Sequence, residues 1–175
     1  IFLFVFTILV LIFAPVFILI FAPGFYFDPI KQNISIDVLR IMFPYLALIS
    51  LVAFAGGIQN THQKFSVPAF TPVIFNLCLI VSAIFIAPMY DMPIYVLAWG
   101  VLLAGILQLL IQISPLLSIN RLPVPKLDIK NRGLRKFFKL ILPAILAGGI
   151  IQINLLIDTI FASLLETGSP TWLYV

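Results

Sequence analysis

The chain has 175 residues, of which 63% are hydrophobic and only 9% charged, and its formal net charge is +4. Its mean hydropathy is +1.23. A soluble domain of this length has too little interior to bury so much apolar surface, so the composition excludes a soluble protein and indicates an integral membrane protein. With a single cysteine, Cys78, the chain can form no internal disulfide.

Five apolar stretches are long enough to cross a bilayer, which takes about 20 mostly apolar residues in a helix. In chain order they are approximately Ile1–Phe21, Ile41–Ile58, Val67–Ala87, Ile94–Ile113 and Phe137–Leu165. No alternation of apolar and polar residues persists long enough to indicate a β-barrel. The sequence therefore predicts an all-α fold, a polytopic helical membrane protein with about five transmembrane helices.

The first stretch opens the chain at Ile1 without an initiator methionine, and the chain stops at Val175 without a polar tail. We therefore expect a fragment of a longer protein. The first stretch lacks the basic segment of a signal peptide and is longer than a signal-peptide core, so we interpret it as a truncated spanning helix.

The connections between the stretches indicate which span ends face the cytoplasm. With five spans, the second and fourth connections lie on one side, and their basic side chains are opposed only by Asp128. These side chains are Lys64, Arg121, Lys126, Lys130, Arg132, Arg135, Lys136 and Lys139. Because basic residues near span ends favour the cytoplasmic face, we predict that both connections are cytoplasmic. Topology explains this charge, so we expect contacts with membrane lipids and no nucleic-acid partner.

Amide side chains lie in and beside the second and third stretches. Gln59 and Asn60 end the second stretch, where amides often cap a helix. Asn76 lies in the third stretch, among prolines. The single histidine, His62, lies in a predicted cytoplasmic turn, where we expect it to be solvated. Asn60 and Asn76 are candidates to line a polar cavity.

The fifth stretch carries a polar stripe. At about 100° per residue, its polar residues gather on one side of the helix and aliphatic residues occupy the other. The stripe comprises Gly148, Gln152, Thr159 and Ser163, and it is adjoined by Asn154 and Asp158, which are four residues apart. Such a stripe faces either a water-filled cavity or an interhelical hydrogen-bond network, and both interpretations stay open. In the first case Gln152 and Ser163 line the cavity.

Asp158 has no basic residue near it in sequence, and an ionised carboxylate inside a bilayer is costly without compensation. Either the carboxyl is protonated, or it is ionised and binds a cation. Asn154, one helical turn earlier, and Thr159 would then add oxygen ligands, which hard cations such as Na⁺ prefer. Asp158, Asn154 and Thr159 are therefore a candidate cation site, and we expect no other cofactor.

Prolines and glycine pairs recur in or beside the spans. An interior proline removes a backbone donor and tends to kink its helix, and glycines let helices approach closely. Two interpretations account for these residues. Either they serve helix packing alone, or they let bent helices rock between two arrangements, as transporters require. The residues are Pro15, Pro44, Pro68, Pro72, Pro143, Gly56, Gly57, Gly148 and Gly149.

Enzyme motifs are absent from the sequence. It has no glycine-rich phosphate loop and no cysteine or histidine cluster with metal-binding spacing. A membrane enzyme that acts on lipids usually shows paired acids or histidines at a membrane face, and the sequence has no such pair. We therefore expect that the protein is not an enzyme.

Three segments carry motifs in a recognisable order. FPYLALISLVAFAGGIQNTHQKFSVPAFTPVIFN, from Phe43 to Asn76, joins an FPY entry, a small-residue helix ending in an amide pair, a short basic turn and a proline-rich entry to the next helix. LAWGVLLAGILQLLIQI and LPAILAGGIIQINLLIDTIFASLLETGSPTWLYV follow, at Leu97–Ile113 and Leu142–Val175. With these segments in this order, the chain resembles the bacterial lipid II flippases of the MurJ (MviN) family.

This resemblance implies the fold of the multidrug/oligosaccharidyl-lipid/polysaccharide exporter superfamily, in which two helical lobes surround a central cavity. Residues 1–117 would hold helices three to six of the first lobe, residues 118–139 the basic cytoplasmic linker between lobes, and residues 140–175 the first helix of the second lobe. The arginines that give the family its cationic cavity would lie on helices outside this chain.

The resemblance also implies a function. The protein would flip lipid II, the lipid-linked peptidoglycan precursor, across the bacterial inner membrane by alternating access, as a transporter of cell-wall synthesis. Two alternatives stay open. A sibling exporter of the same superfamily would carry another polyprenyl-linked saccharide or drugs, and a membrane scaffold for cell-wall synthesis would transport nothing.

Overall fold

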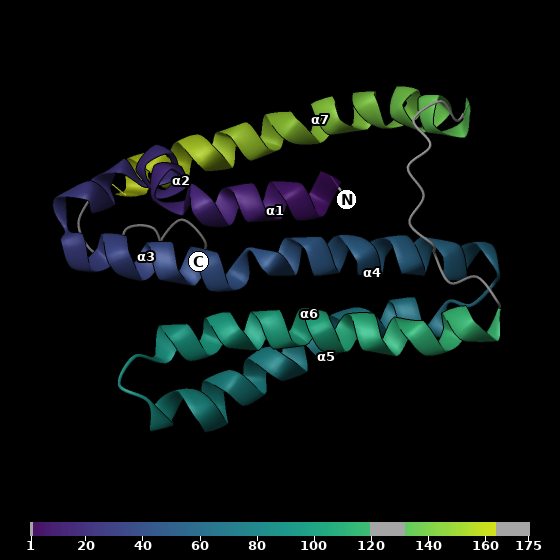
Figure 1. Ribbon diagram of the computed structural model, residues 1–175, viewed down its shortest axis with the longest axis horizontal. Coiled ribbons are helices and arrows are strands. Elements are labelled where there is room, and N and C mark those ends of the chain that lie inside the picture. Colours follow the sequence, from purple (N-terminus) through teal and green to yellow (C-terminus); the bar gives the residue numbers. More distant parts are fainter. Residues whose placement is uncertain (1, 120–131, 164–175) are drawn as a thin grey trace. The chain divides into compact units, whose positions relative to one another are not determined.

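The computed structural model describes residues 2–119 and 132–163, and within those ranges every regular element is helical. The elements are α1 (Phe2–Ile12), α2 (Ala14–Phe21), η1 (Pro23–Phe27), α3 (Pro29–Met42), α4 (Pro44–Thr61), α5 (Ser66–Val81), η2 (Ser82–Ile86), η3 (Ala87–Met89), α6 (Pro93–Ser118) and α7 (Arg132–Ser163) (Figure 1). The predicted all-α, polytopic fold is confirmed.

Within the described ranges, three helical runs are long and apolar enough to cross a membrane: Pro29–Thr61, Ser66–Met89 and Pro93–Ser118. They contain the second, third and fourth apolar stretches, so these predicted spans are confirmed. The first stretch forms α1 and α2, a bent pair that together reaches spanning length. The fifth stretch falls on α7. Among the described residues of α7, the apolar part is the shorter segment Gln152–Phe161, so a fifth span stays a prediction.

A proline explains why the first stretch is two helices. Pro15 has no backbone N–H, and its ring would collide with the carbonyl of Leu11 one turn earlier. The α-helix is interrupted at Phe13, between α1 and α2. The Leu11 carbonyl instead accepts a hydrogen bond from Nε of Arg40, at 3.3 Å. An α3 side chain thus satisfies the backbone group that the proline leaves without its helical donor.

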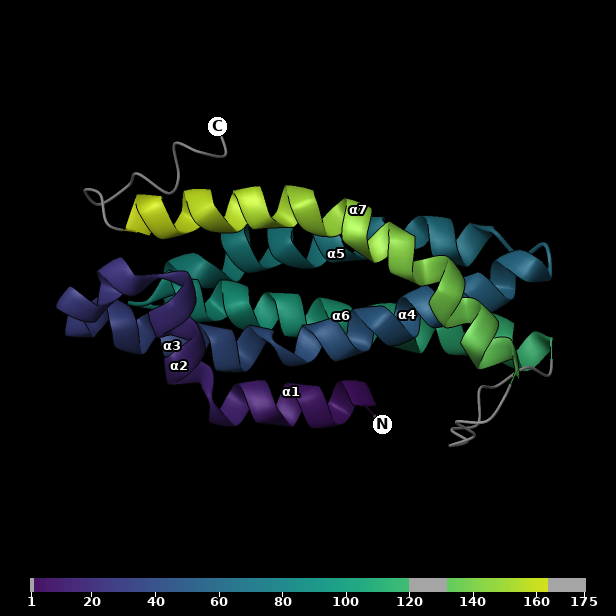
Figure 2. The same cartoon turned by 90° about the horizontal axis from the view of Figure 1, so that it is seen from above.

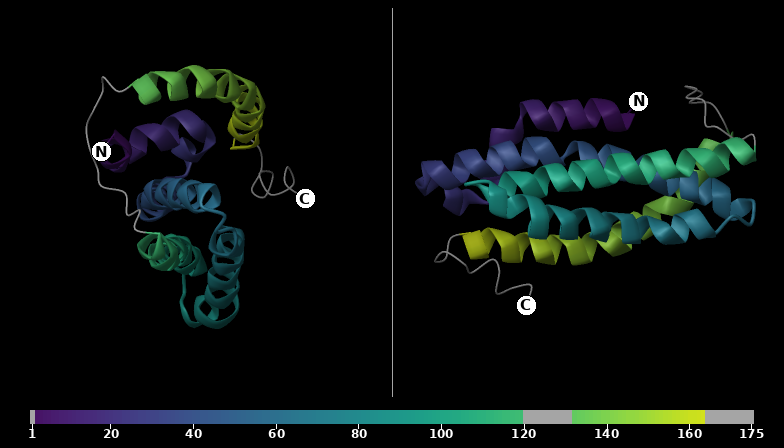
Figure 3. Two further views of the ribbon diagram at one scale, coloured as in Figure 1. Left: turned by 90° about the vertical axis from the view of Figure 1, so that its right-hand side faces the viewer. Right: turned by 90° about the horizontal axis from the view of Figure 1, so that it is seen from below.

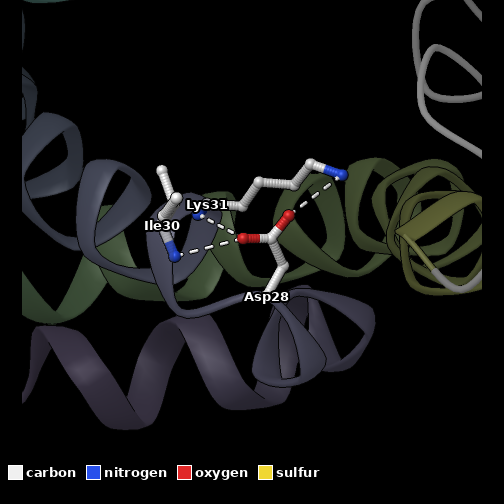
Figure 4. A network of polar contacts seen from close by, with 3 residues as sticks. All are labelled: Asp28, Ile30 and Lys31. Carbon is white, nitrogen blue, oxygen red and sulfur yellow. Dashed lines mark hydrogen bonds and ion pairs between the residues drawn. The ribbon is translucent and has the colours of Figure 1, made fainter.

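α3 begins well before the apolar stretch that was expected to start at Ile41. The Asp28 carboxylate accepts hydrogen bonds from the amides of Ile30 and Lys31, at 3.1 and 3.2 Å, and Lys31 Nζ lies 3.4 Å from its other oxygen (Figure 4). Pro29 follows Asp28 as the first helical residue, a favoured position for proline. The hydrogen bond from the Lys31 amide contributes most to lowering the pKa of Asp28.

α4, α5 and α6 form a bundle in which α6 runs alongside both other helices (Figures 1 and 2). An end-on view also shows the three as neighbours (Figure 3, left). Glycines permit the close approach: a Cβ on Gly105 would lie 2.7 Å from Cδ2 of Tyr45 on α4. A Cβ on Gly100 would lie 2.9 Å from Cβ of Ser82 on η2. Small residues thus bring the backbones of these spans together.

The chain divides into two compact units. One comprises Ile1–Ala14 and Ile34–Val124, and the other Pro15–Asn33 and Pro125–Val175. The α4–α6 bundle belongs to the first unit and α7 to the second. α7 begins at Arg132, inside the segment 118–139 that was predicted to be a linker, and residues 120–131 of that segment lie outside the described ranges. The proposed lobe boundaries stay a prediction.

Candidate functional site

Four polar side chains are buried together in the α4–α6 bundle. Gln59 of α4 is 0% exposed, Thr71 of α5 is 7% exposed, and Gln108 and Gln112 of α6 are 2% and 1% exposed. Buried polar groups need hydrogen-bond partners, because water no longer supplies them. In this amide cluster, the residues Gln59, Thr71, Gln108 and Gln112, the partners come from neighbouring helices.

Hydrogen bonds of the amide cluster connect all three helices. Gln59 Nε2 donates to Oε1 of Gln112 and to its main-chain carbonyl, the latter at 3.3 Å. Gln112 Nε2 donates to the Thr71 hydroxyl at 3.2 Å. Gln108 Nε2 donates to the Thr71 carbonyl at 2.9 Å. Thr71 on α5 therefore receives bonds from two successive turns of α6.

Two oxygens of the amide cluster lack such partners. Oε1 of Gln59 and Oε1 of Gln108 are buried without a hydrogen-bond donor among the residues that the structure describes. A buried acceptor without a donor costs free energy, on the order of 1–3 kcal/mol. Of the two glutamines, Gln108 lines the pocket described next and Gln59 does not.

A pocket of about 500 Å³ adjoins the amide cluster, and Thr71, Gln108 and Gln112 contribute to its lining. Small and polar residues of α4 and prolines of α5 line it at helical spacing: Ala53, Gly56, Asn60, Pro68 and Pro72. At its aromatic wall, Tyr45 and Phe75 lie with ring centroids 5.5 Å apart. None of the described residues that line this pocket is charged.

The structure corrects the sequence reading of Gln59 and adds two residues. Gln59 is not a helix cap, because its amide group points its hydrogen bonds at α6 rather than at the end of α4. Gln108 and Gln112 were not among the candidates. Their spacing of four inside an apolar span was the available signal, since it places two amides on one face of a helix.

The candidate cavity residues lie in different surroundings. Asn60 is exposed and lines the pocket of the bundle, whereas Asn76 is exposed on α5 and does not line that pocket. On α7, Gln152 belongs with Thr159 to the lining of a second pocket, of about 520 Å³, which Phe21 of α2 also lines. The side chain of Ser163, the last residue of α7, lies outside what the structure describes.

The candidate cation ligands lie on consecutive turns of α7. Asn154 and Asp158 are four residues apart and exposed, so one face of the helix presents both. The Thr159 hydroxyl donates to the carbonyl of Leu155 at 2.7 Å, which still leaves its oxygen able to coordinate a cation. Among the described residues, no three His, Cys, Asp or Glu side chains gather as a metal site would require. A cation role of Asn154, Asp158 and Thr159 stays a prediction.

Apolar helices of spanning length and polar groups buried between them define a polytopic helical membrane protein. The family profile described as "Lipid II flippase MurJ" matches residues 1–175. The chain belongs to the lipid II flippase MurJ family, a family of transporters, and is a multi-pass protein of the bacterial inner membrane.

Individual relatives agree with this assignment. The chain is 44% identical over 173 residues to the "Probable lipid II flippase MurJ" of Buchnera aphidicola subsp. Acyrthosiphon pisum (strain APS), an alignment that covers 99% of this chain and 34% of the relative. It is 45% identical over 136 residues to the "Probable lipid II flippase MurJ" of Haemophilus influenzae, covering 78% and 27%. It is 36% identical over 156 residues to the "Lipid II flippase MurJ" of Burkholderia cenocepacia, covering 87% and 30%. The chain thus spans about a third of the length of the curated relatives it matches.

Proposed function

We propose that this chain forms part of a lipid II flippase, which moves the lipid-linked peptidoglycan precursor from the inner to the outer leaflet of the bacterial inner membrane by alternating access. The observation that carries the proposal is the match of the family profile to residues 1–175. The relatives whose names carry the same activity support it.

The physical task of such a protein is to shelter a polar head group. A pyrophosphate and its sugars cannot cross hydrocarbon unaided, because each buried polar group that loses its hydration costs several kcal/mol. Fixed protein dipoles can replace that hydration. The amide cluster and the polar side of α7 are groups of this kind inside otherwise apolar spans. The first apolar stretch is bent between α1 and α2, beside Pro15.

We further propose that Asp158, with Asn154 and Thr159, holds a monovalent cation such as Na⁺ that couples transport to an energy source. The three side chains offer oxygen atoms on one part of α7, and Asp158 supplies the negative charge. Moving one elementary charge through the membrane potential is worth about 2.3 kcal/mol per 100 mV. Further ligands would come from elsewhere in the complete protein.

A depletion experiment tests the proposed function. The complete gene product is expressed in a bacterium whose own lipid II flippase can be switched off, and lipid II on the outer face is measured with an enzyme that acts only there. We expect growth and surface lipid II to be restored. If the protein is present in the membrane at normal levels and lipid II still accumulates inside, the proposed function is wrong.

A further inference from the structure

The pocket beside the amide cluster combines features that restrict what it can bind. Gln108, only 2% exposed, lines the pocket and keeps its Oε1 without a donor among the described residues. Gln112 and Thr71, bonded to each other, line it as well. Its polar end therefore presents amide and hydroxyl groups that are held in place by hydrogen bonds between helices.

This lining argues against three kinds of occupant. Phosphate and pyrophosphate need charge-assisted donors such as arginine or lysine, and the described lining has no charged side chain. A divalent metal needs carboxylates, which the lining also lacks. A lipid chain would leave the Gln108 oxygen buried against hydrocarbon, which is costly for an unpaired acceptor.

A neutral group with many hydroxyl or amide N–H donors fits the same lining. Its donors would satisfy Oε1 of Gln108, and the second N–H of the Gln108 and Gln112 amides would bond its oxygens. The Thr71 hydroxyl already donates its hydrogen to the Val67 carbonyl at 3.1 Å. The aromatic wall of Tyr45 and Phe75 would cover an apolar face, as on a sugar ring. The volume, about 500 Å³, lies in the range of ordinary small-molecule sites.

The pocket extends along α4 from Tyr45 to Asn60, and its Asn60 end suits a substrate that arrives from the cytoplasm. Asn60 near the end of α4 and Pro68 near the start of α5 both line it, and the short turn between these helices carries Lys64. That turn is predicted to be cytoplasmic from its basic charge. A lipid-linked saccharide assembled on the inner face would meet this end of the bundle first.

We propose that the pocket between α4, α5 and α6 binds a sugar ring of the lipid-linked substrate, with Gln108 accepting a hydrogen bond from the sugar. The site distinguishes the saccharide from the bare polyprenyl pyrophosphate, while the pyrophosphate is bound elsewhere. This inference rests on the proposed function, because it assumes that the complete protein receives a polyprenyl-pyrophosphate saccharide.

Two variants of the pocket and one control distinguish a loss of sugar binding from a general loss of folding. Gln108→Leu nearly keeps the volume and removes the acceptor, together with the hydrogen bond to the Thr71 carbonyl. Gly57→Leu fills the pocket and leaves the amide cluster unchanged, since a Cβ on Gly57 meets no atom within 4 Å. Ala69→Leu is the control, because Ala69 is exposed on α5 and absent from the pocket lining.

The experiment measures binding of two probes to the complete gene product in lipid nanodiscs: a polyprenyl pyrophosphate without sugar, and the same lipid carrying its saccharide. We expect the unaltered protein and Ala69→Leu to bind the saccharide lipid about tenfold more tightly, the effect of one well-placed buried hydrogen bond. Gln108→Leu and Gly57→Leu should bind both probes with nearly equal affinity.

Other binding results would contradict either the sugar site or the proposed function. If the unaltered protein binds both probes equally well, or if both pocket variants retain the full preference, the sugar does not occupy this pocket and the inference is wrong while the proposed function stands. If the unaltered protein binds neither probe, the proposed function fails together with the inference.

Discussion

α6 and α7 both carry polar residues four apart in apolar surroundings, yet the two helices use them differently. Gln108 and Gln112 of α6 are buried, and their hydrogen bonds reach α4 and α5. Asn154 and Asp158 of α7 are exposed. Helical spacing predicts that such residues share a face. Whether that face becomes a network or stays available to a ligand depends on which helices pack against it.

The largest expected difference between the two regions concerns added volume. Gly105→Leu places a side chain where even a Cβ would lie 2.7 Å from Tyr45, whereas a Cβ on Gly149 of α7 meets no atom within 4 Å. We expect Gly105→Leu to destabilise the protein by about 3 kcal/mol or more through overpacking. Gly149→Leu should be neutral or stabilise α7 by up to about 1 kcal/mol, because glycine disfavours helix.

Thermal unfolding of the complete gene product in detergent, followed by size exclusion, measures both glycine variants. Equal losses at the two positions would show that α7 is packed as tightly as the bundle, and the comparison would fail. Gly105→Ala serves as a milder variant of the first, which we expect to lie between Gly105→Leu and the unaltered protein.

A smaller difference is expected for the amides themselves. Gln112→Leu removes the acceptor of Gln59 Nε2 and the donor to Thr71, so it leaves buried groups unpaired and should cost about 1–3 kcal/mol of stability. Gln152→Leu alters an exposed side chain of α7 and should stay within about 0.5 kcal/mol. The same unfolding measurement tests the pair. A loss at Gln152 as large as that at Gln112 would indicate a buried network on α7 too.

The sequence predicted the parts of the fold that depend on local composition. Three spans and the interruption at Pro15 follow from hydropathy and from the chemistry of proline, both of which act within a few residues. The early start of α3 was missed because hydropathy windows do not weigh the cap formed by Asp28 and Pro29, although that signal is also local.

The candidate site was less predictable, because its hydrogen bonds join residues far apart in sequence. Gln59 and Gln112 are separated by 53 positions, and no local pattern at Gln59 distinguishes a cap from a partner for α6. Asn60, a candidate cavity residue from the sequence, lines the pocket, and its functional role stays a prediction. The roles proposed for Asp158, Asn154 and Thr159 stay predictions.

Asp158 provides a test of function on the α7 side of the comparison. In the complete gene product, Asp158→Asn keeps the shape of the side chain and removes its charge, so folding and membrane level should be unchanged. Transport of lipid II should fall about fivefold to tenfold, the effect of roughly 1 kcal/mol in coupling free energy. Asp158→Glu should be partly active.

The measurement for Asp158 is flippase activity against Na⁺ concentration, with the protein level checked by blotting. Gln112→Leu is the matched variant in the bundle: it should lower stability without changing the dependence of activity on Na⁺. If Asp158→Asn transports like the unaltered protein at every Na⁺ concentration, Asp158 is a packing residue and the coupling proposal fails.

The smallest expected effect concerns Asp28. Its contacts are with residues two and three positions away, whereas the hydrogen bonds of the amide cluster join residues far apart in sequence. Its pKa is lowered from 3.8, chiefly by the hydrogen bond from the Lys31 amide. Because the folded value is the lower one, the cap contributes stability above the ordinary value and loses that contribution as the pH falls through the folded value. We therefore expect no change above about pH 5 and fraying of the first turn of α3 only in stronger acid.

Amide NMR shifts of Ile30 and Lys31 in detergent should titrate with a midpoint below 3.8. In Asp28→Asn, which keeps an acceptor and cannot ionise, the two shifts should not follow that titration. A midpoint at or above the ordinary value would mean that the carboxylate does not cap α3, and that the start of this helix depends on distant packing as the amide cluster does.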